Sequence, residues 1–215
     1  QKINQIRDRI FTEADNSIKY VDLKNHIFCM NVPTGSGKTL NSLSVALTLR
    51  ERLAKEGVNS HIIYGLPFTS IIDQNYEVYT QVLKMPDSDL LVKHHHLSDI
   101  SYKYTENEEF EPEEAKFLIE SWESEIVVTT FFQIFHTLFS NRNRMIEKFH
   151  KFANSIILLD EVQTIPYKYW ELVRETLLKL AEIFNTYFIL ITATQPKIFK
   201  DGEIMGISKG LGHFF

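Results

Sequence analysis

The segment that most constrains the fold of this chain is Phe28–Leu40, FCMNVPTGSGKTL, an apolar run followed by a glycine-containing loop and Lys-Thr. Glycines in such a loop let backbone N–H groups converge at the start of a helix, where the donors and the helix dipole favour a phosphate. Lys38 would reach the β- and γ-phosphates of ATP, and the Thr39 hydroxyl would bind Mg²⁺. The predicted nucleotide-binding residues are Thr34, Gly35, Ser36, Gly37, Lys38 and Thr39.

One position departs from the usual phosphate-loop pattern. Val32 stands where the first glycine of Gly-x-x-x-x-Gly-Lys-Ser/Thr belongs. That position only begins the loop, whereas the segment from Gly35 to Thr39 makes the close contacts, so the departure is tolerable. The alternative to a nucleotide site is an ordinary glycine turn.

The pattern of apolar residues predicts an α/β fold with a doubly wound, mainly parallel sheet. Continuous, largely β-branched runs suit strands that are buried on both faces. Helical spacing follows Lys38, with Gly57 as its C-cap, and recurs from Trp170 to Phe184. Strands that alternate with helices imply right-handed crossovers, with ligands at the carboxyl ends of the strands. The predicted strands are 26–32, 61–66, 90–93, 125–129, 155–160 and 187–192.

Composition narrows the class of protein. With 44% hydrophobic residues the chain can build a real core, and without an internal repeat or linker we expect one domain over residues 1–215. Cys29 is the single cysteine, which favours a buried strand residue and a reducing, cytoplasmic location. The longest uncharged stretch, Ile126–Asn141, is too short to span a bilayer, so no membrane partner is expected. The net charge of −5 argues against a protein coated in basic surface.

A pair of acids should complete the nucleotide site. Residues 155–163, SIILLDEVQ, form an apolar strand that delivers Asp160 and Glu161 at its carboxyl end. Asp160 would hold Mg²⁺ through its waters, and Glu161 would orient and deprotonate the attacking water. A solvated turn is the alternative for such a pair in isolation. Beside a phosphate loop, the pair favours a hydrolase over a kinase.

The order of the motifs resembles the first motor domain of superfamily 2 helicases. The segments VPTGSGKT, LPFTSIIDQ, VVTTFFQIF, LLDEVQ and ITATQP follow one another from about residue 2 to 196. Within that superfamily, the sequences of these motifs are most similar to those of the CRISPR-associated helicase-nuclease of type I interference systems. This resemblance implies two tandem RecA-like domains, a histidine-aspartate nuclease domain, a Cascade-like surveillance complex as partner, and ATP-driven 3′-to-5′ movement on single-stranded DNA.

The resemblance also assigns roles to individual residues. Gln163 would link the γ-phosphate site to the neighbouring domain, Thr192 and Thr194 would couple hydrolysis to strand movement, and Gln5 would read the adenine. The segments expected to touch the DNA backbone are Pro67, Phe68 and Thr69, together with Thr129 and Thr130. A purely structural role is the alternative for these residues, because threonines at strand ends often cap helices.

Other segments leave several interpretations open. His94, His95 and His96 could hold a metal, line a DNA groove or be structural, and Thr105–Glu114 reads as a solvated loop with an acidic helix start. Residues 197–215 could be the linker to a second RecA-like domain or part of its start. Because the chain opens on Gln1, we expect a piece of a larger protein. Rival functions are another superfamily 2 motor, such as a restriction-enzyme translocase or RNA helicase, a nucleotide-gated binding module, and a nucleoside kinase.

Overall fold

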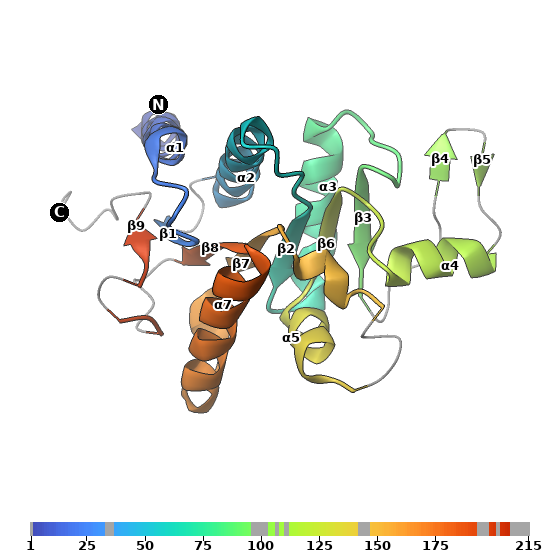
Figure 1. Ribbon diagram of the computed structural model, residues 1–215. Coiled ribbons are helices and arrows are strands. Elements are labelled where there is room, and N and C mark those ends of the chain that lie inside the picture. The colour runs from blue at the N-terminus through green and yellow to red at the C-terminus, as the bar shows by residue number, and fades with distance from the viewer. Residues whose placement is uncertain are drawn as a thin grey trace.

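In the computed structural model a twisted parallel sheet runs through the centre of the molecule, with helices on both faces (Figure 1). The structure describes residues 2–32, 37–95, 103–105, 108–109, 112–141, 147–192, 198–200 and 203–206. Within these residues, seven parallel strands lie in the order β3-β6-β2-β7-β8-β1-β9. Their bounds are β1 Ile27–Asn31, β2 Ile62–Leu66, β3 Leu91–His94, β6 Ile126–Thr130, β7 Ile156–Asp160, β8 Tyr187–Thr192 and β9 Met205–Gly206.

The six predicted strands are confirmed, and their continuous apolar runs have a simple cause. Side chains alternate between the two faces of a strand, and both faces of this sheet are covered. In β2, Ile62 and Tyr64 join the core on one face, while Ile63 joins the core on the other. The two-residue strand β9 was not predicted, since so short a segment carries no periodicity.

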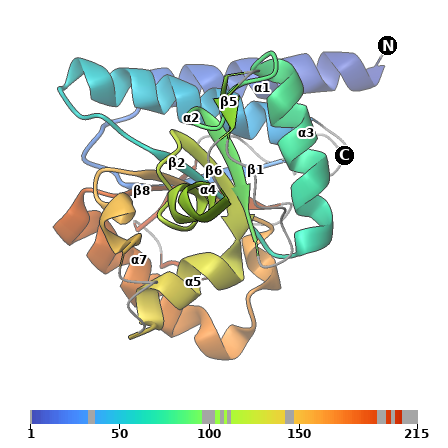
Figure 2. The same cartoon turned by 90° about the vertical axis from the view of Figure 1, so that its right-hand side faces the viewer.

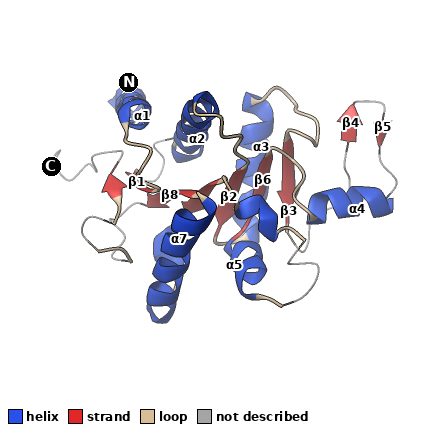
Figure 3. Ribbon diagram, viewed as in Figure 1, coloured by secondary structure: helices blue, strands red, loops and turns tan. Residues whose placement is uncertain are grey.

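The helices divide between the two faces of the sheet (Figures 1 and 2). One face is covered by α1 Lys2–Tyr20, α2 Lys38–Lys55 and α3 Ile72–Val82, and the other by α4 Pro112–Glu120, α5 Phe131–Phe139 and α7 Trp170–Phe184. Short 3₁₀ turns join several of these elements: η1 Thr69–Ile71, η2 Phe149–Phe152, η3 Val162–Thr164 and η4 Tyr167–Tyr169. Figure 3 shows the strands of the main sheet between these two groups of helices. The predicted doubly wound α/β architecture is therefore confirmed.

The end of α2 confirms the role predicted for Gly57. Gly57 adopts a φ of 81°, a left-handed conformation that glycine reaches without a steric penalty. Its N–H donates to Ala54 O at 3.0 Å, and the N–H of Val58 donates to Leu53 O at 2.9 Å. These two bonds form a Schellman motif, and the apolar side chains of Leu53 and Val58 both belong to the same core.

The glutamate-rich segment is only partly the loop that was predicted. β4 Lys103–Thr105 and β5 Glu108–Glu109 pair in antiparallel fashion, outside the main sheet. The acidic helix start is confirmed, because α4 begins at Pro112 and carries Glu113 and Glu114 in its first turn. The loop prediction failed here because pairing between strands this short leaves no alternating pattern in the sequence.

Two expectations from composition can be compared with the structure. No helix in the described part of the chain is long and apolar enough to cross a membrane. Cys29 is a buried residue of β1, and burial raises the pKa of its thiol to about 11. The interpretation of Cys29 as a structural strand residue is therefore confirmed.

Candidate nucleotide-binding site

The order of the strands brings the predicted nucleotide residues together. β8 lies between β7 and β1, so the acids that end β7 lie one strand away from the strand that leads into the phosphate loop. All three strands are parallel, and their carboxyl ends therefore meet at one edge of the sheet. Lys38, Asp160, Glu161, Gln163 and Thr192 are joined there by direct side-chain contacts.

Lys38 is the centre of this arrangement. Its ammonium lies 2.9 Å from Asp160 Oδ1 and also forms an ion pair with Glu161 Oε1. The Lys38 side chain is only 16% exposed, and its burial opposes the positive charge. The two carboxylates outweigh that effect and raise the pKa of Lys38, so the lysine stays charged at neutral pH.

Asp160 has a second partner that sequence reasoning missed. The hydroxyl of Tyr64, on neighbouring strand β2, donates a hydrogen bond of 2.8 Å to Asp160 Oδ2. The Tyr64 ring is fully buried and stacks on Tyr79 of α3, with ring centroids 5.3 Å apart. Burial raises the pKa of the Asp160 carboxyl, while Lys38 and Tyr64 act in the opposite direction. The signal available in the sequence was a hydroxyl inside the apolar run IIYGL, since a buried hydroxyl needs a partner.

Glu161 stands on strained backbone. Its φ of 56° and ψ of 41° place a non-glycine residue in the left-handed region. The Glu161 N–H still donates to Ile191 O at 2.9 Å, so the residue remains tied to β8 while its side chain turns toward Lys38. Strain of this kind is concentrated at functional sites, where the surrounding structure holds a side chain in place.

Gln163 bridges the acid pair and the end of β8. Its Nε2 donates to Glu161 Oε2, and its Oε1 accepts a hydrogen bond of 2.7 Å from Thr192 Oγ1. Both ends of the amide are therefore fixed, and a displacement of either Glu161 or β8 would be felt by the other. This is the physical link that a coupling residue requires.

Thr39, in the first turn of α2, lies beside a second residue that was missed. Gly37 precedes the helix with a φ of 82°, a conformation that favours glycine. The Thr39 hydroxyl donates to Asn75 Oδ1 at 2.6 Å, and Asn75 Nδ2 donates to Ile71 O at 2.8 Å. Asn75 directly follows the motif LPFTSIIDQ, so the motif itself did not include it.

The oxygen atoms at this site are of the kind that Mg²⁺ binds. Thr39 Oγ1, Asn75 Oδ1 and the Asp160 carboxylate are hard donors. The carboxylate and the amide also belong to one hydrogen-bonded group around Tyr64, whose hydroxyl lies 2.8 Å from Asp160 Oδ2 and 3.5 Å from Asn75 Oδ1. The residues predicted to bind the metal, Thr39 and Asp160, therefore fit the ion chemically.

The residues assigned to the DNA backbone lie at the same edge of the sheet. Pro67, Phe68 and Thr69 follow β2, where Phe68 is exposed. Thr129 is fully buried and donates to His94 O at 2.7 Å, whereas Thr130 caps α5 by accepting from the Gln133 N–H at 3.1 Å. Both threonines thus have structural hydrogen bonds, and their contact with DNA stays a prediction.

His94 belongs to a buried polar cluster under α4 and α5. Its Nδ1 accepts a hydrogen bond of 2.9 Å from the indole N–H of Trp122, which fixes the tautomer. Burial, together with nearby Lys148 and His95, lowers the pKa of His94 to about 3. The described residues contain no group of three or more His, Cys, Asp or Glu side chains arranged to hold a metal. A structural role is the one that these contacts support for His94.

Several predicted residues lie outside the part that the structure describes. They are Thr34, Gly35, Ser36, Thr194, His96 and, of segment 197–215, all but residues 198–200 and 203–206. Gln5 lies on α1, but its side chain is also outside the described set. Their predicted roles in binding phosphate, coupling and adenine recognition stay predictions.

Comparison with known proteins identifies the family of this chain. The family model described as the type III restriction enzyme, res subunit, matches residues 3–197. A "CRISPR-associated nuclease/helicase Cas3" of Haloferax volcanii is 33% identical over 187 residues, which cover 82% of this chain and 20% of the relative. The chain therefore spans about a fifth of the length of the curated relative it matches.

Solved structures share the fold. The crystal structure of T. fusca Cas3-AMPPNP matches with a TM-score of 0.59 and 17% identity, over 85% of this chain and 20% of that protein. A structure of the DUF1998 helicase MrfA bound to DNA matches with a TM-score of 0.61 and 16% identity, over 93% of this chain and 25% of that protein. The chain belongs to the family of the type III restriction enzyme res subunit, and its resemblance is to the first RecA-like motor domain of Cas3.

Proposed function

We propose that this chain is the ATP-binding half of a DNA motor. It would bind ATP with Mg²⁺, hydrolyse it, and use the energy to move along single-stranded DNA together with a second RecA-like domain. The observation that carries this proposal is the continuous contact from Lys38 through Glu161 and Gln163 to Thr192. Such a chain of contacts joins a phosphate-binding lysine to a carboxylate base and to a neighbouring strand end.

The chemistry follows from the charges and positions of the residues. A triphosphate would compete with the two carboxylates for the Lys38 ammonium, because the same charge suits either anion. Once Lys38 turned to the phosphates, the Glu161 carboxylate would be released to accept a proton from the attacking water. Thr39 and Asp160 would hold Mg²⁺, which neutralises charge on the β- and γ-phosphate oxygens.

The relatives support the larger context. Their names include a CRISPR-associated nuclease/helicase and a helicase bound to DNA. On that basis we propose that the whole protein acts in cytoplasmic antiviral defence, with a nuclease domain in the same polypeptide and a Cascade-like complex as partner. Residues 1–215 would form one domain, with 197–215 leading toward the second RecA-like domain.

Two variants of the full-length protein test the proposed chemistry. Glu161→Gln should keep ATP binding and abolish hydrolysis, whereas Lys38→Ala should weaken binding as well. Fluorescent-nucleotide titration measures binding, and phosphate release measures turnover with single-stranded DNA or RNA present. Normal turnover by Glu161→Gln would exclude Glu161 as the base. Stronger stimulation by RNA than by DNA would favour an RNA helicase.

The isolated 215-residue domain provides a separate test of the half-motor. Arginines that reach the γ-phosphate from a second domain are worth roughly 10³ to 10⁵ in rate in related systems. The domain alone should therefore hydrolyse ATP feebly or not at all. Robust DNA-stimulated turnover by the isolated monomer would contradict this part of the proposal.

A further inference from the structure

Two adjoining hollows lie at the carboxyl edge of the sheet, and their linings differ in chemistry. The first, which we call the apolar groove, has a volume of about 490 Å³ and lies between α5 and the segment 164–173. The second, which we call the hydroxyl hollow, has a volume of about 630 Å³ and is lined by Pro67, Phe68, Thr69, Ser70, Thr130 and Phe132. Pro67, Phe68 and Phe132 line both.

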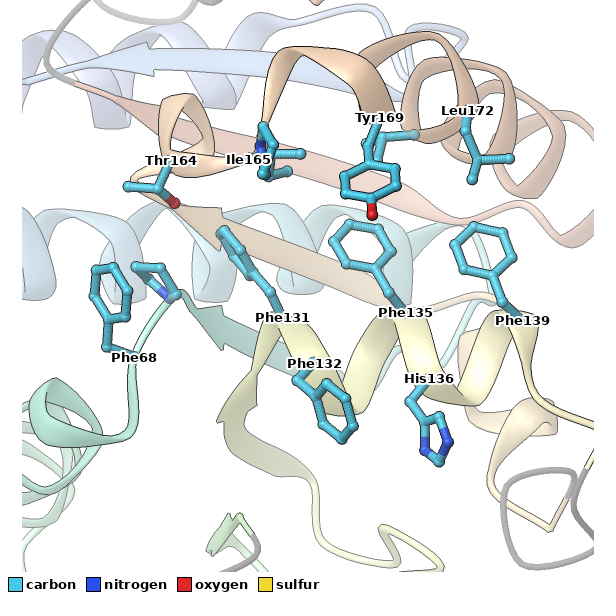
Figure 4. A pocket seen from close by; sticks show the side chains of 13 residues that line it. Phe68, Phe131, Phe132, Phe135, His136, Phe139, Thr164, Ile165, Tyr169 and Leu172 are labelled. Atoms are coloured by element: carbon cyan, nitrogen blue, oxygen red, sulfur yellow. The ribbon is translucent and has the colours of Figure 1, made fainter.

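Figure 4 shows how α5 divides its aromatic side chains between two directions. Phe131, Phe135 and Phe139 lean into the apolar groove, toward Tyr169 and Leu172. Phe132 projects from another side of the helix, as does His136 (Figure 4). The Phe132 ring therefore borders the apolar groove but points away from Tyr169 and Leu172.

The side chains of Phe68 and Phe132 are both more than half exposed to solvent. Phe68 is 59% exposed and Phe132 is 66% exposed. Phe132 is also held in orientation, because its ring stacks on His136 with centroids 5.1 Å apart and an interplanar angle of 16°. One face of the ring is thus occupied, and the high exposure comes from the rest of the ring.

The hydroxyl hollow also offers groups that suit a phosphate backbone. Thr69 and Ser70 follow Phe68 directly, and Thr130 lies at the end of the neighbouring strand β6. Hydroxyl side chains are common ligands of nucleic-acid phosphates, and aromatic rings stack on bases of any sequence. No acidic side chain is among the residues that line this hollow. The apolar groove, in contrast, is lined mainly by aromatic and aliphatic side chains, with His136, Thr164 and Tyr169 as its polar members.

We infer that Phe68 and Phe132 stack on bases of single-stranded DNA, while the hydroxyls of the same hollow hold its phosphates. The inference rests on the proposed function and deepens it, because the motif assigned only backbone contacts to Pro67, Phe68 and Thr69. The strand would then be held by base faces as well as by its backbone, which lets an acidic domain bind DNA with few cations.

Strand binding by the full-length protein, with a non-hydrolysable ATP analogue present, tests this inference. Fluorescence anisotropy would compare an oligothymidylate with a strand of the same length that carries abasic sites. Phe68→Ala and Phe132→Ala should each weaken binding of the oligothymidylate roughly 5- to 150-fold. The same variants should bind the abasic strand as the wild type does, because that strand has no bases to stack. Phe132→Trp should retain the affinity.

Phe139→Ala is the matched control. Phe139 lies on the same helix and is 50% exposed, but it lines only the apolar groove. This variant should bind both strands normally. If Phe68→Ala and Phe132→Ala bind oligothymidylate as tightly as the wild type does, the rings do not stack on bases and an apolar protein surface is the better partner. If the wild-type protein binds neither strand, the proposed DNA motor itself is contradicted.

Discussion

The buried hydroxyl of Tyr64 donates a hydrogen bond of 2.8 Å to Oδ2 of Asp160. The two residues are 96 positions apart in the sequence, and adjacent parallel strands β2 and β7 bring them together. Tyr64 thus supports, through Oδ2, the carboxylate that is expected to hold the metal, whereas Lys38 contacts Oδ1. Mutation of a residue that holds a metal ligand in place typically lowers metal affinity or activity about 10- to 100-fold.

Replacing Tyr64 with phenylalanine should disturb the site but keep the aromatic ring in the core. The variant removes one hydrogen bond to a charged group, which should cost about 1–3 kcal/mol of unfolding free energy. Loss of this donor should also raise the pKa of Asp160 further, so the acid side of the ATPase pH profile should move to higher pH. Urea denaturation and the pH dependence of phosphate release measure the two effects.

Tyr79→Phe is the control for this prediction. Tyr79 is equally buried and stacks on Tyr64, but its hydroxyl does not bond to Asp160. Its replacement should leave the pH profile unchanged. Equal shifts in both variants would show that packing, rather than the bond to Asp160, is responsible.

The bridge from Glu161 through Gln163 to Thr192 predicts energetic coupling. Gln163→Ala and Thr192→Val each break the bridge, and each should lower DNA-stimulated turnover about tenfold, the equivalent of one hydrogen bond. ATP binding should be nearly unchanged. The double variant should be no slower than either single variant, because both remove the same connection. Multiplicative effects would mean that the two residues act independently.

The buried state of His94 predicts a loss of stability in acid. The pKa of His94 is about 3 in the folded chain and about 6.5 in the unfolded chain. As the pH falls, His94 is therefore protonated in the unfolded chain at a higher pH than in the folded chain. This stability is present above pH 6.5 and is lost as the pH falls toward 3. Between pH 7 and pH 5 the loss should be about 2 kcal/mol. Urea denaturation at the two pH values measures it.

His94→Asn should remove this part of the pH dependence. Asparagine supplies an oxygen acceptor for the Trp122 indole but binds no proton in this range. The exposed His150, replaced in the same way, is the control and should have little effect. An unchanged difference between pH 7 and pH 5 in His94→Asn would mean that other groups set the acid sensitivity.

The close packing around Gly65 of β2 predicts that a larger side chain there would destabilise the chain. A Cβ added there would lie 2.5 Å from Ile134 Cδ1 and 3.2 Å from Leu159 Cδ2. Gly65→Ala should therefore destabilise the chain by about 1–3 kcal/mol. Because the closest atom is the end of a flexible side chain, Ile134→Val should relieve the clash. Thermal unfolding of the double variant should show less destabilisation than the sum of the two single changes, and strict additivity would contradict this explanation.

The sequence by itself determined the local features of this protein. Continuous apolar runs located six strands, because a strand buried on both faces must be apolar throughout. The Gly-Ser-Gly-Lys-Thr loop and the Asp160–Glu161 pair could be recognised in the sequence because each motif is a short contiguous segment at a strand end. Gly57 could be recognised as the end of a helix for the same reason, since the left-handed conformation that ends a helix depends on the residue at that position.

Only the tertiary structure decided which of these features meet. The pairings Tyr64–Asp160, Thr39–Asn75, Gln163–Thr192 and Trp122–His94 depend on strand order and register, and no local pattern encodes either. The exposure of Phe132 is another example, since the largely apolar sequence FFQIFHTLF does not indicate which of its rings stays at the surface. The fold covers only part of that helix and leaves Phe132 at the surface, where the free energy of burying it remains available to a ligand.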